Sequence, residues 1–394
     1  MNISFVELLK INTVLYIIYT NWFSTGIFNS PIILYGLSFL SIMWLILDIQ
    51  HNRCLKKIND KIISMYIVYG IYAFVAGIFI AINKKYFSTQ MFTYFANLLL
   101  YYEIYYISKK EKDTSWIEKG FEISAILALI QIYIFPYADP LSGRLSLGPS
   151  SNANMVGVLF TVGIFFLVNN INKVEKKFYA RLILIILFLY GIVLTGSRKA
   201  LLAGLVLTII WVVTYFASEV GKKMKVKSMF SIMLVLIGCI VVVKYISTEF
   251  INTDIYYRFN LLISGKGSHM RQDLYRDAFE LWKNHILFGV GYCQFIFYTA
   301  TKHISHSTYM EILSCTGSIG FIIFFIPIIN LGLRIIKKMI LEKKEKTYNL
   351  LMLLAFFLIE IALGFGQEWI YYSIHMIMIL YLSLSLGVKN TSVN

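Results

Sequence analysis

Residues 308–331 read TYMEILSCTGSIGFIIFFIPIINL and form an almost uninterrupted apolar run. Its single charged residue, Glu311, lies close to the start. About 20 helical residues cross the roughly 30 Å hydrocarbon core of a bilayer. This run is therefore long and apolar enough to span a membrane as a helix.

Similar runs recur along the whole chain, which is 58% hydrophobic and only 14% charged. Soluble domains are about a quarter charged, so the composition predicts an all-α, polytopic integral membrane protein with about twelve transmembrane helices. No internal repeat or soluble domain is visible, and we expect residues 1–394 to form a single transmembrane domain. The expected spans cover residues 8–28, 31–49, 62–82, 90–107, 120–137, 151–169, 181–196, 199–217, 229–247, 308–331, 349–366 and 370–387.

The basic residues predict the orientation of these spans. More than half of the 36 Lys and Arg residues fall in alternate loops, and the positive-inside rule places such loops in the cytoplasm together with both termini. Because the positive charges lie in short clusters between spans, the net charge of +15 does not indicate nucleic-acid binding. The five basic loops contain residues 53–61, 109–119, 173–181, 222–227 and 334–346.

The long polar interruption, residues 248–307, is expected to be a large external loop. Within it, Leu274, Ala278, Leu281 and Trp282 recur at helical spacing, which predicts an amphipathic helix at the outer membrane surface. We expect the glycines of the Gly289–Gly291 turn to end this helix and return the chain to the bilayer.

Ionisable groups that suit acid–base chemistry gather at the end of this loop. His306 precedes the tenth span, and an imidazole can accept a proton from a hydroxyl near neutral pH. A histidine at a membrane interface is also a common snorkelling residue. Glu311, about one turn deeper, must face a polar cavity, pair with a cation or be protonated. His303 and His269 are alternative candidates for the base.

Three arginines are expected on the external side, and their planar guanidinium groups suit a diphosphate. Arg144 precedes the sixth span, Arg198 lies in a turn beside Lys199, and Arg271 is in the first turn of the loop helix. Each paired, charge-assisted hydrogen bond contributes roughly 1.5–3 kcal/mol. An anchoring role for Arg198 and Lys199 fits the charge pattern equally well. From the charge pattern alone, a solvated helix face paired with nearby acids is the more common role for Arg271 and Arg276.

The remaining polar groups give little sign of a cofactor. The four cysteines are widely spread, with no close-spaced pair that would indicate a metal site or a disulfide framework. Asn152 and Asn154, at the start of the sixth span, can cap a helix or bind sugar hydroxyls, and capping is the more common role.

Four short stretches occur together in an order that resembles the superfamily of O-antigen ligases and Wzy-type O-antigen polymerases. They are RLSLGPSSNAN at 144–154, TGSRKALL at 195–202, the segment 271–291, and HSTYMEILSCTGSIG at 306–320. The span count and the late external loop agree with this resemblance. The family often has asparagine after the histidine, where this chain has Ser307.

The resemblance implies a GT-C-like membrane glycosyltransferase of the bacterial cytoplasmic membrane that needs neither a metal nor another cofactor. Its partner would be an undecaprenyl-diphosphate-linked oligosaccharide, with a chain-length regulator and a flippase as further partners. By the same resemblance, His306 would deprotonate the acceptor hydroxyl while Arg198 and Arg271 hold the diphosphate. Arg144 and Glu311 would support the substrate site.

Three functions remain open from the sequence. A polymerase would join lipid-linked repeat units into O-antigen or capsule, and is favoured over a ligase, which would transfer finished glycan to an acceptor. A lipid-linked oligosaccharide flippase or other transporter belongs to a different class. Transporters concentrate charges near the bilayer midplane and show structural repeats, whereas the cations here are predicted at the outer surface.

Overall fold

The computed structural model describes residues 4–23, 30–52, 59–139, 143–149, 151–170, 178–219, 269–342 and 344–387. These residues form a helical bundle and one short antiparallel hairpin, β1 (Tyr137–Ala138) with β2 (Leu145–Ser146). The α-helices are α1 (Phe5–Ile18), α2 (Pro31–Asn52), α3 (Lys61–Ile80), α4 (Lys84–Glu111), α5 (Ser115–Ile134), α6 (Ala153–Asn170), α7 (Phe178–Leu194), α8 (Arg198–Glu219), α11 (His269–Asn284), α12 (Thr308–Leu341), α13 (Lys344–Leu363) and α14 (Ser373–Gly387). A π-helix, η1 (Tyr19–Phe23), extends α1, and a 3-10 helix, η5 (Phe295–Phe297), follows α11.

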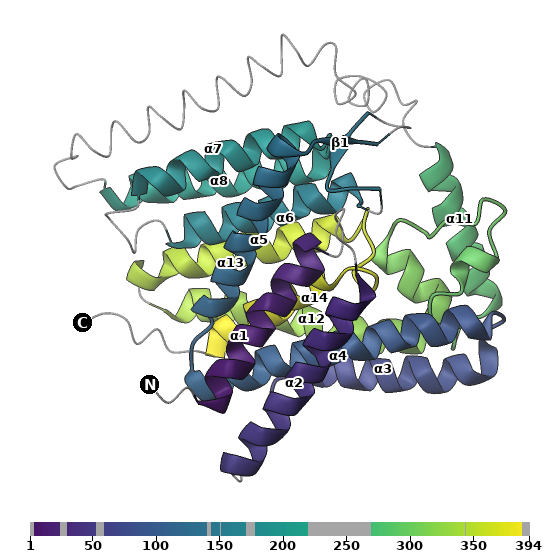
Figure 1. The fold of residues 1–394 in the computed structure, drawn as a ribbon. Helices are drawn as coiled ribbons and strands as arrows, with labels where there is room; N and C mark the ends of the chain where they lie inside the picture. Colours follow the sequence, from purple (N-terminus) through teal and green to yellow (C-terminus); the bar gives the residue numbers. More distant parts are fainter. Residues whose placement is uncertain are drawn as a thin grey trace.

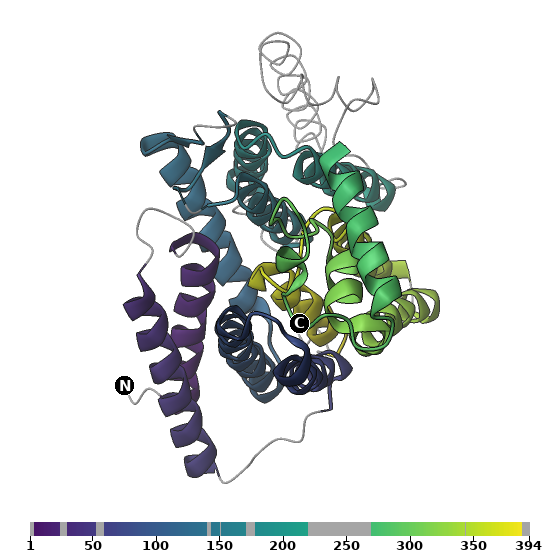
Figure 2. The same ribbon diagram turned by 90° about the vertical axis from the view of Figure 1, so that its right-hand side faces the viewer.

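Most of these helices run along a common direction, whereas α11 lies across one end of the bundle (Figure 1). Viewed down the bundle, α11 lies on one side, in front of α12 (Figure 2). The start of α1 and the end of α14 lie at the end opposite α11 (Figure 1). The bundle therefore has two distinct ends, called here the α11 end and the terminal end.

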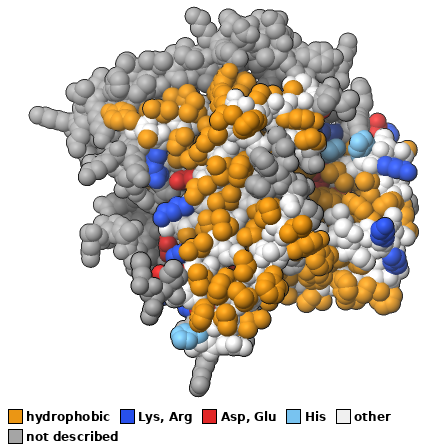
Figure 3. All heavy atoms as spheres, viewed as in Figure 1, with side chains coloured by type: hydrophobic (Ala, Val, Ile, Leu, Met, Phe, Trp, Pro, Cys, Tyr) orange, Lys and Arg blue, Asp and Glu red, His pale blue; other side chains and the backbone are white. Residues whose placement is uncertain are grey.

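The outside of the bundle is apolar, as a lipid-facing surface requires. Ile32 is 78% exposed and Phe79 is 81% exposed. Hydrophobic side chains cover most of the face in Figure 3, and Lys and Arg side chains gather toward its two sides. Three described helices are apolar and long enough to cross a membrane (Ile32–His51, Lys61–Ile80 and Thr308–Leu341), and four shorter helices are also apolar. The predicted all-α polytopic membrane protein is confirmed, while the expected span 229–247 lies outside the described residues.

Helix α6 lies inside the bundle because small residues let its neighbours approach. A Cβ on Gly157 would lie 2.8 Å from Cβ of Ser197, immediately before α8, and one on Gly163 would lie 2.8 Å from the ring of Phe188 in α7. Close approach at small residues is the usual way in which membrane helices pack. This packing fixes the start of α8, and with it Arg198, against the start of α6.

Helix α12 is longer than the expected span and is broken at Gly317, where φ is 65° and ψ is −171°. The break opens the helix backbone to the segment that follows α11. Ser318 N donates to Ile286 O at 2.8 Å, and a Cβ at Gly317 would lie 2.3 Å from Leu287 O. Only glycine combines this φ with such close backbone contact. Gly317 therefore joins the segment that follows α11 to the bundle.

The amphipathic helix predicted in the large loop is present as α11. Leu274 and Ala278 are buried in a small cluster with Phe295 and Cys315. The prediction that the Gly289–Gly291 turn ends this helix is wrong, because α11 ends at Asn284. The glycines instead press against α12. Gly289 has φ 66°, and a Cβ there would lie 2.5 Å from the Cys315 carbonyl carbon.

Candidate active site

His306 lies at the α11 end, immediately before α12. Its backbone is left-handed, with φ 56°, and Ser307 caps the helix by accepting from Met310 N at 3.5 Å. The hydroxyl of Tyr275, in α11, donates to His306 O at 3.3 Å. The side chain of His306 is 33% exposed, so an incoming hydroxyl can reach its ring.

Glu368 lies beside the imidazole of His306. Nδ1 of His306 lies 3.4 Å from Oε1 of Glu368, whose side chain is only 3% exposed. This oxygen accepts no hydrogen bond from any described residue. A buried carboxylate beside an imidazole can orient the ring and stabilise the positive charge that the ring acquires on accepting a proton. The structure thus adds to His306 a partner that the sequence analysis missed.

The segment from Gly364 to Tyr372, between α13 and α14, positions Glu368. It is longer than the expected turn and is fastened to the first residue of α12. Thr308 N donates to Gly364 O at 2.9 Å, and Trp369 N donates to Oγ1 of Thr308 at 3.0 Å. An acidic residue in a turn between two apolar spans was the only sequence signal that pointed to Glu368.

Glu311 is fully buried and holds the residues around His306 in place. Its Oε2 accepts from Ser305 N at 2.9 Å, and its Oε1 accepts from the Tyr371 hydroxyl at 2.9 Å. Glu311 therefore ties the turn before α12 to the segment that contains Glu368. This arrangement suits a supporting role rather than direct contact with a ligand.

Basic residues of two helices, α8 and α11, lie near one another in this region. Arg198 and Lys199 begin α8, after a turn in which Gly196 has φ 64°. The amino group of Lys199 lies over Gly366, where a Cβ would be 2.0 Å from Nζ. Lys199 interacts electrostatically with Arg271, Arg198 and Glu368. The structure thus brings together Arg198 and Arg271, which the sequence analysis selected, and adds Lys199, which it did not assign to the site.

Tyr275 connects α11 to this cluster. Burial raises the pKa of its hydroxyl, while nearby Arg271 lowers that pKa and Glu368 raises it. Besides His306 O, the hydroxyl donates to Phe365 O. Tyr275 therefore holds α11 against both segments that contain the His306–Glu368 pair.

Arg144 lies behind the start of α8. It is buried, with Nε donating to Thr195 O at 2.7 Å and NH2 donating to Oδ1 of Asn154 at 2.6 Å. Asn154 N in turn donates to Oδ1 of Asn152 at 2.9 Å, so Asn152 caps α6 as expected. Arg144 thereby fixes the turn that presents Arg198.

The other candidates lie at the margin of the site. His303 is exposed, and its ring centre lies 6.5 Å from that of His306. Arg276 pairs with Asp273 at 2.9 Å on an exposed face of α11. His269 begins α11 but its side chain lies outside the described residues. No group of three or more His, Cys, Asp or Glu that could hold a metal occurs in the described part of the chain.

Part of the chain is similar to a known protein family. No curated protein matches the chain. A family model described as O-antigen ligase matches residues 182–325, a segment that includes Arg198, Arg271, His306 and Glu311. Arg144 and Glu368 lie outside the matched segment. Over residues 182–325, less than half of its length, the chain is similar to the O-antigen ligase family.

Proposed function

We propose that this protein is a polysaccharide polymerase that joins undecaprenyl-diphosphate-linked repeat units at the external face of the bacterial cytoplasmic membrane. The observation that carries the proposal is the His306–Glu368 pair at 3.4 Å, with Arg198, Lys199 and Arg271 gathered beside it. A base and a cation cluster are the two elements that glycan transfer from a lipid diphosphate requires.

The proposed reaction begins at the acceptor hydroxyl. The unprotonated nitrogen of His306 takes the hydroxyl proton as the oxygen attacks the anomeric carbon of the donor glycan. The bond between that carbon and the diphosphate oxygen breaks, and the electron pair leaves with the diphosphate. Glu368 stabilises the protonated imidazole, which later releases its proton to water.

The cations stabilise the leaving group. Negative charge grows on the diphosphate as the bond breaks, and preorganised positive groups stabilise that charge without having to reorganise. The guanidinium groups of Arg198 and Arg271 can each donate two parallel hydrogen bonds to phosphate oxygens, whereas Lys199 supplies a point charge. The donor is already activated by its diphosphate, so the reaction needs no nucleotide sugar.

The location of the site suits a lipid-anchored donor. Amphipathic α11 crosses the end of the bundle and carries Arg271, so the cluster lies where a lipid headgroup would meet the membrane surface (Figure 2). A chain-length regulator and a flippase that supplies the donor are further proposed partners. The charge pattern places both termini on the cytoplasmic side.

A ligase is the second candidate, because the matching family model is described as O-antigen ligase. Ligation uses the same base and the same leaving group and differs only in the acceptor. A transporter is not favoured, because the cluster lies at one end of the bundle rather than at its middle.

Deletion of the gene and analysis of surface glycan on gels tests the proposal. Loss of long chains with single repeat units left on the usual acceptor identifies a polymerase. Long glycan retained on undecaprenyl diphosphate identifies a ligase. An unchanged glycan profile contradicts both functions.

Complementation with variants tests the site itself. We expect His306→Ala to restore no product although the protein reaches the membrane. His285→Ala is the matched control, because His285 is exposed, lies near Tyr298 and takes no part in the cluster. Normal product from His306→Ala, with loss of product from His303→Ala, would transfer the role of base to His303.

A further inference from the structure

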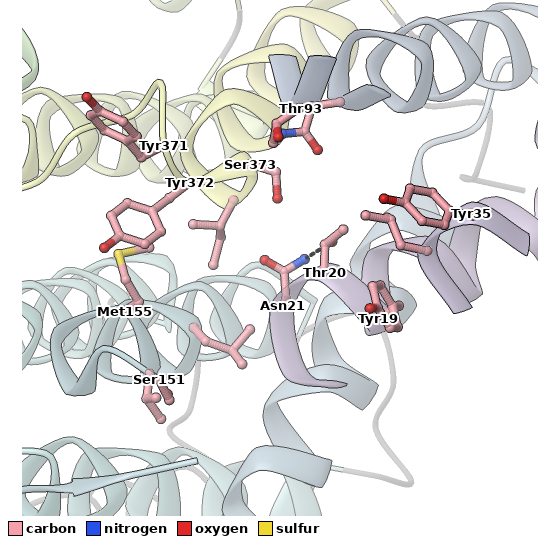
Figure 4. A pocket seen from close by; sticks show the side chains of 15 residues that line it. Tyr19, Thr20, Asn21, Tyr35, Thr93, Ser151, Met155, Tyr371, Tyr372 and Ser373 are labelled. Carbon is pink, nitrogen blue, oxygen red and sulfur yellow. Dashed lines mark hydrogen bonds between the residues drawn. The ribbon is translucent and has the colours of Figure 1, made fainter. Parts of the chain in front are cut away.

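A cavity lined by polar and apolar side chains lies beside the candidate site, between the N-terminal helices and the centre of the bundle. Its volume is about 440 Å³, and η1, α2, α4, α6 and the segment leading into α14 line it. Figure 4 shows Asn21 and Ser373 entering the same space from opposite sides, with Tyr35 and Tyr372 at its flanks. The proposed reaction assigns no role to this cavity.

The lining is polar and aromatic but uncharged. Hydroxyl, amide and phenol groups alternate with aliphatic side chains, and no Lys, Arg, Asp or Glu is among the described residues that line it. An anionic headgroup would therefore find no countercharge there. Uncharged sugars match this lining, because their hydroxyls pair with amides and hydroxyls while their C–H faces pack on aromatic rings.

Several of these polar groups have no partner among the described residues. The hydroxyl of Tyr35, the amide of Asn97 and the hydroxyl of Ser373 form no hydrogen bond within the part of the chain that the structure describes. Tyr35 lies in apolar α2, where unpaired polar groups are costly next to lipid. A polar occupant would satisfy all three groups at once.

The π-helix η1 contributes to the same wall. Asn21 Nδ2 donates to Ile17 O at 2.8 Å, which fixes the side chain and leaves its carbonyl oxygen without a donor among the described residues. Single turns of π-helix are rare, and they occur frequently at functional sites. The π-helical extension of α1 thus places another hydrogen-bonding group at the cavity.

The cavity is linked to the catalytic segment through two adjacent tyrosines. Tyr371 donates to Glu311 at 2.9 Å, and the Tyr372 hydroxyl accepts from Asn152 at 3.2 Å. Both tyrosines follow Glu368 closely in the segment between α13 and α14, and both line the cavity. The cavity therefore adjoins the segment that contains Glu368 and, through Tyr371 and Glu311, the turn before α12.

We propose that this cavity is a subsite for uncharged sugar residues of the glycan chain, an inference that rests on the proposed glycosyl transfer. A hydrocarbon chain would leave the free amide and hydroxyl groups unpaired. A separate groove of about 560 Å³ along α3, lined almost wholly by apolar side chains such as Phe79 and Phe288, fits hydrocarbon better. The hydroxyl and amide groups of the first cavity thus suit a sugar, whereas the apolar groove along α3 suits a lipid chain.

The test uses the full-length protein in nanodiscs and, as probe, the oligosaccharide released by mild acid from the lipid-linked glycans of the host. Tyr35→Ala and Asn97→Ala should each weaken probe binding about 10-fold and raise the KM for transfer, with kcat largely kept, because each removes about 1.4 kcal/mol of contact. Tyr35→Phe removes only the hydroxyl and should have a smaller effect. Both side chains lie at the surface of the bundle without hydrogen-bond partners, so the variants are expected to fold.

Matched controls lie about one turn from Tyr35 and about two turns from Asn97 on the same helices. Phe39→Ala in α2 and Thr89→Ala in α4 remove exposed side chains that do not line the cavity, and should leave probe binding unchanged. His306→Ala should abolish transfer but keep probe binding.

The outcomes separate the two proposals. If His306→Ala transfers glycan normally, the proposed function fails. If His306→Ala is inactive while Tyr35→Ala and Asn97→Ala bind the probe like wild type, only the subsite is overturned. Loss of undecaprenyl phosphate binding in these two variants, with normal probe binding, would also overturn it in favour of a lipid-chain site.

Discussion

The basic residues at the two ends of the bundle differ in whether they pair with acidic residues. At the terminal end, Lys110 contacts Asp48 at 2.6 Å and Lys10 contacts Glu111 at 2.7 Å. At the α11 end, neither Lys199 nor Arg271 forms an ion pair with a residue that the structure describes.

This difference indicates two uses of positive charge. Cations with acidic partners at the terminal end fix helices to one another and mark an orientation across the membrane. Lys199 and Arg271, which form no ion pair with a described residue, repel each other. Such a cluster persists in proteins chiefly where an anionic ligand supplies the missing charge. The α11 end is thus built for binding and the terminal end for anchoring.

The largest effect is expected from exchanging one buried carboxylate at each end for its amide. Glu368→Gln should lower the rate of glycan transfer about 100-fold or more, because the imidazole of His306 loses the carboxylate that orients it. Asp48→Asn should keep the transfer rate and only lower stability, by about 1–3 kcal/mol, because Lys110 and Tyr106 lose a charged acceptor. Initial rates of glycan transfer measure the effect on activity, and thermal unfolding measures the effect on stability, for both purified variants.

A conservative variant separates positioning from simple folding. Glu368→Asp keeps the charge and should recover part of the activity that Glu368→Gln loses. Equal losses of activity in Glu368→Gln and Asp48→Asn would remove the distinction between the two ends.

A smaller effect is expected from exchanging arginine for lysine in the cluster. Arg198→Lys and Arg271→Lys should each reduce transfer roughly 10-fold to 100-fold, since a point charge does not replace two parallel hydrogen bonds. Arg276→Lys, on the same helix as Arg271 but paired with Asp273 in solvent, is the control and should be active. Full activity of Arg198→Lys and Arg271→Lys would point to surface anchoring instead.

One methyl group added at Gly317 should weaken the contact between α12 and the segment that follows α11. Gly317→Ala should destabilise the protein by roughly 1–3 kcal/mol, because φ is positive there and the new Cβ would meet the Leu287 carbonyl. Gly36→Ala in α2, where no atom lies within 4 Å of the new Cβ, should be neutral or slightly stabilising. Thermal unfolding in detergent compares the two, and an unchanged Tm for Gly317→Ala would contradict the packing described.

Cysteine substitutions outside the site can show which end of the bundle faces the outside of the cell, without affecting activity. Lys302→Cys at the α11 end should react in intact cells with an impermeant thiol reagent, followed by mass spectrometry of that peptide. Leu341→Cys, 72% exposed at the terminal end, should react only after the cells are permeabilised. The opposite pattern would reverse the predicted topology.

The helical membrane fold was predictable from local sequence, because a helix in lipid satisfies its own backbone and needs only apolar side chains. The same holds for α11, whose apolar spacing is visible in the sequence. The break in α12 was not predictable, because Gly317 is one of several glycines in apolar runs. Only the contact with the backbone of residues 286–288 requires glycine there.

The candidate site was predictable only in part. His306, Arg198 and Arg271 were selected from the resemblance and from the chemistry of their side chains. Lys199 and Glu368 gained their roles from contacts between segments that are far apart in the chain. The uncharged cavity beside them is formed by five separate elements, none of which has a distinctive sequence.

The sequence by itself determined that the chain is a helical membrane protein, and it indicated which residue types gather near residue 306. These properties depend on hydrophobicity and charge, which each segment carries independently of its neighbours. The tertiary structure alone decided that Glu368 lies behind His306, that Lys199 reaches Gly366, and that the cavity beside Tyr372 is left open. Such placements depend on how helices pack around small residues, and packing is a property of pairs of segments rather than of any single one.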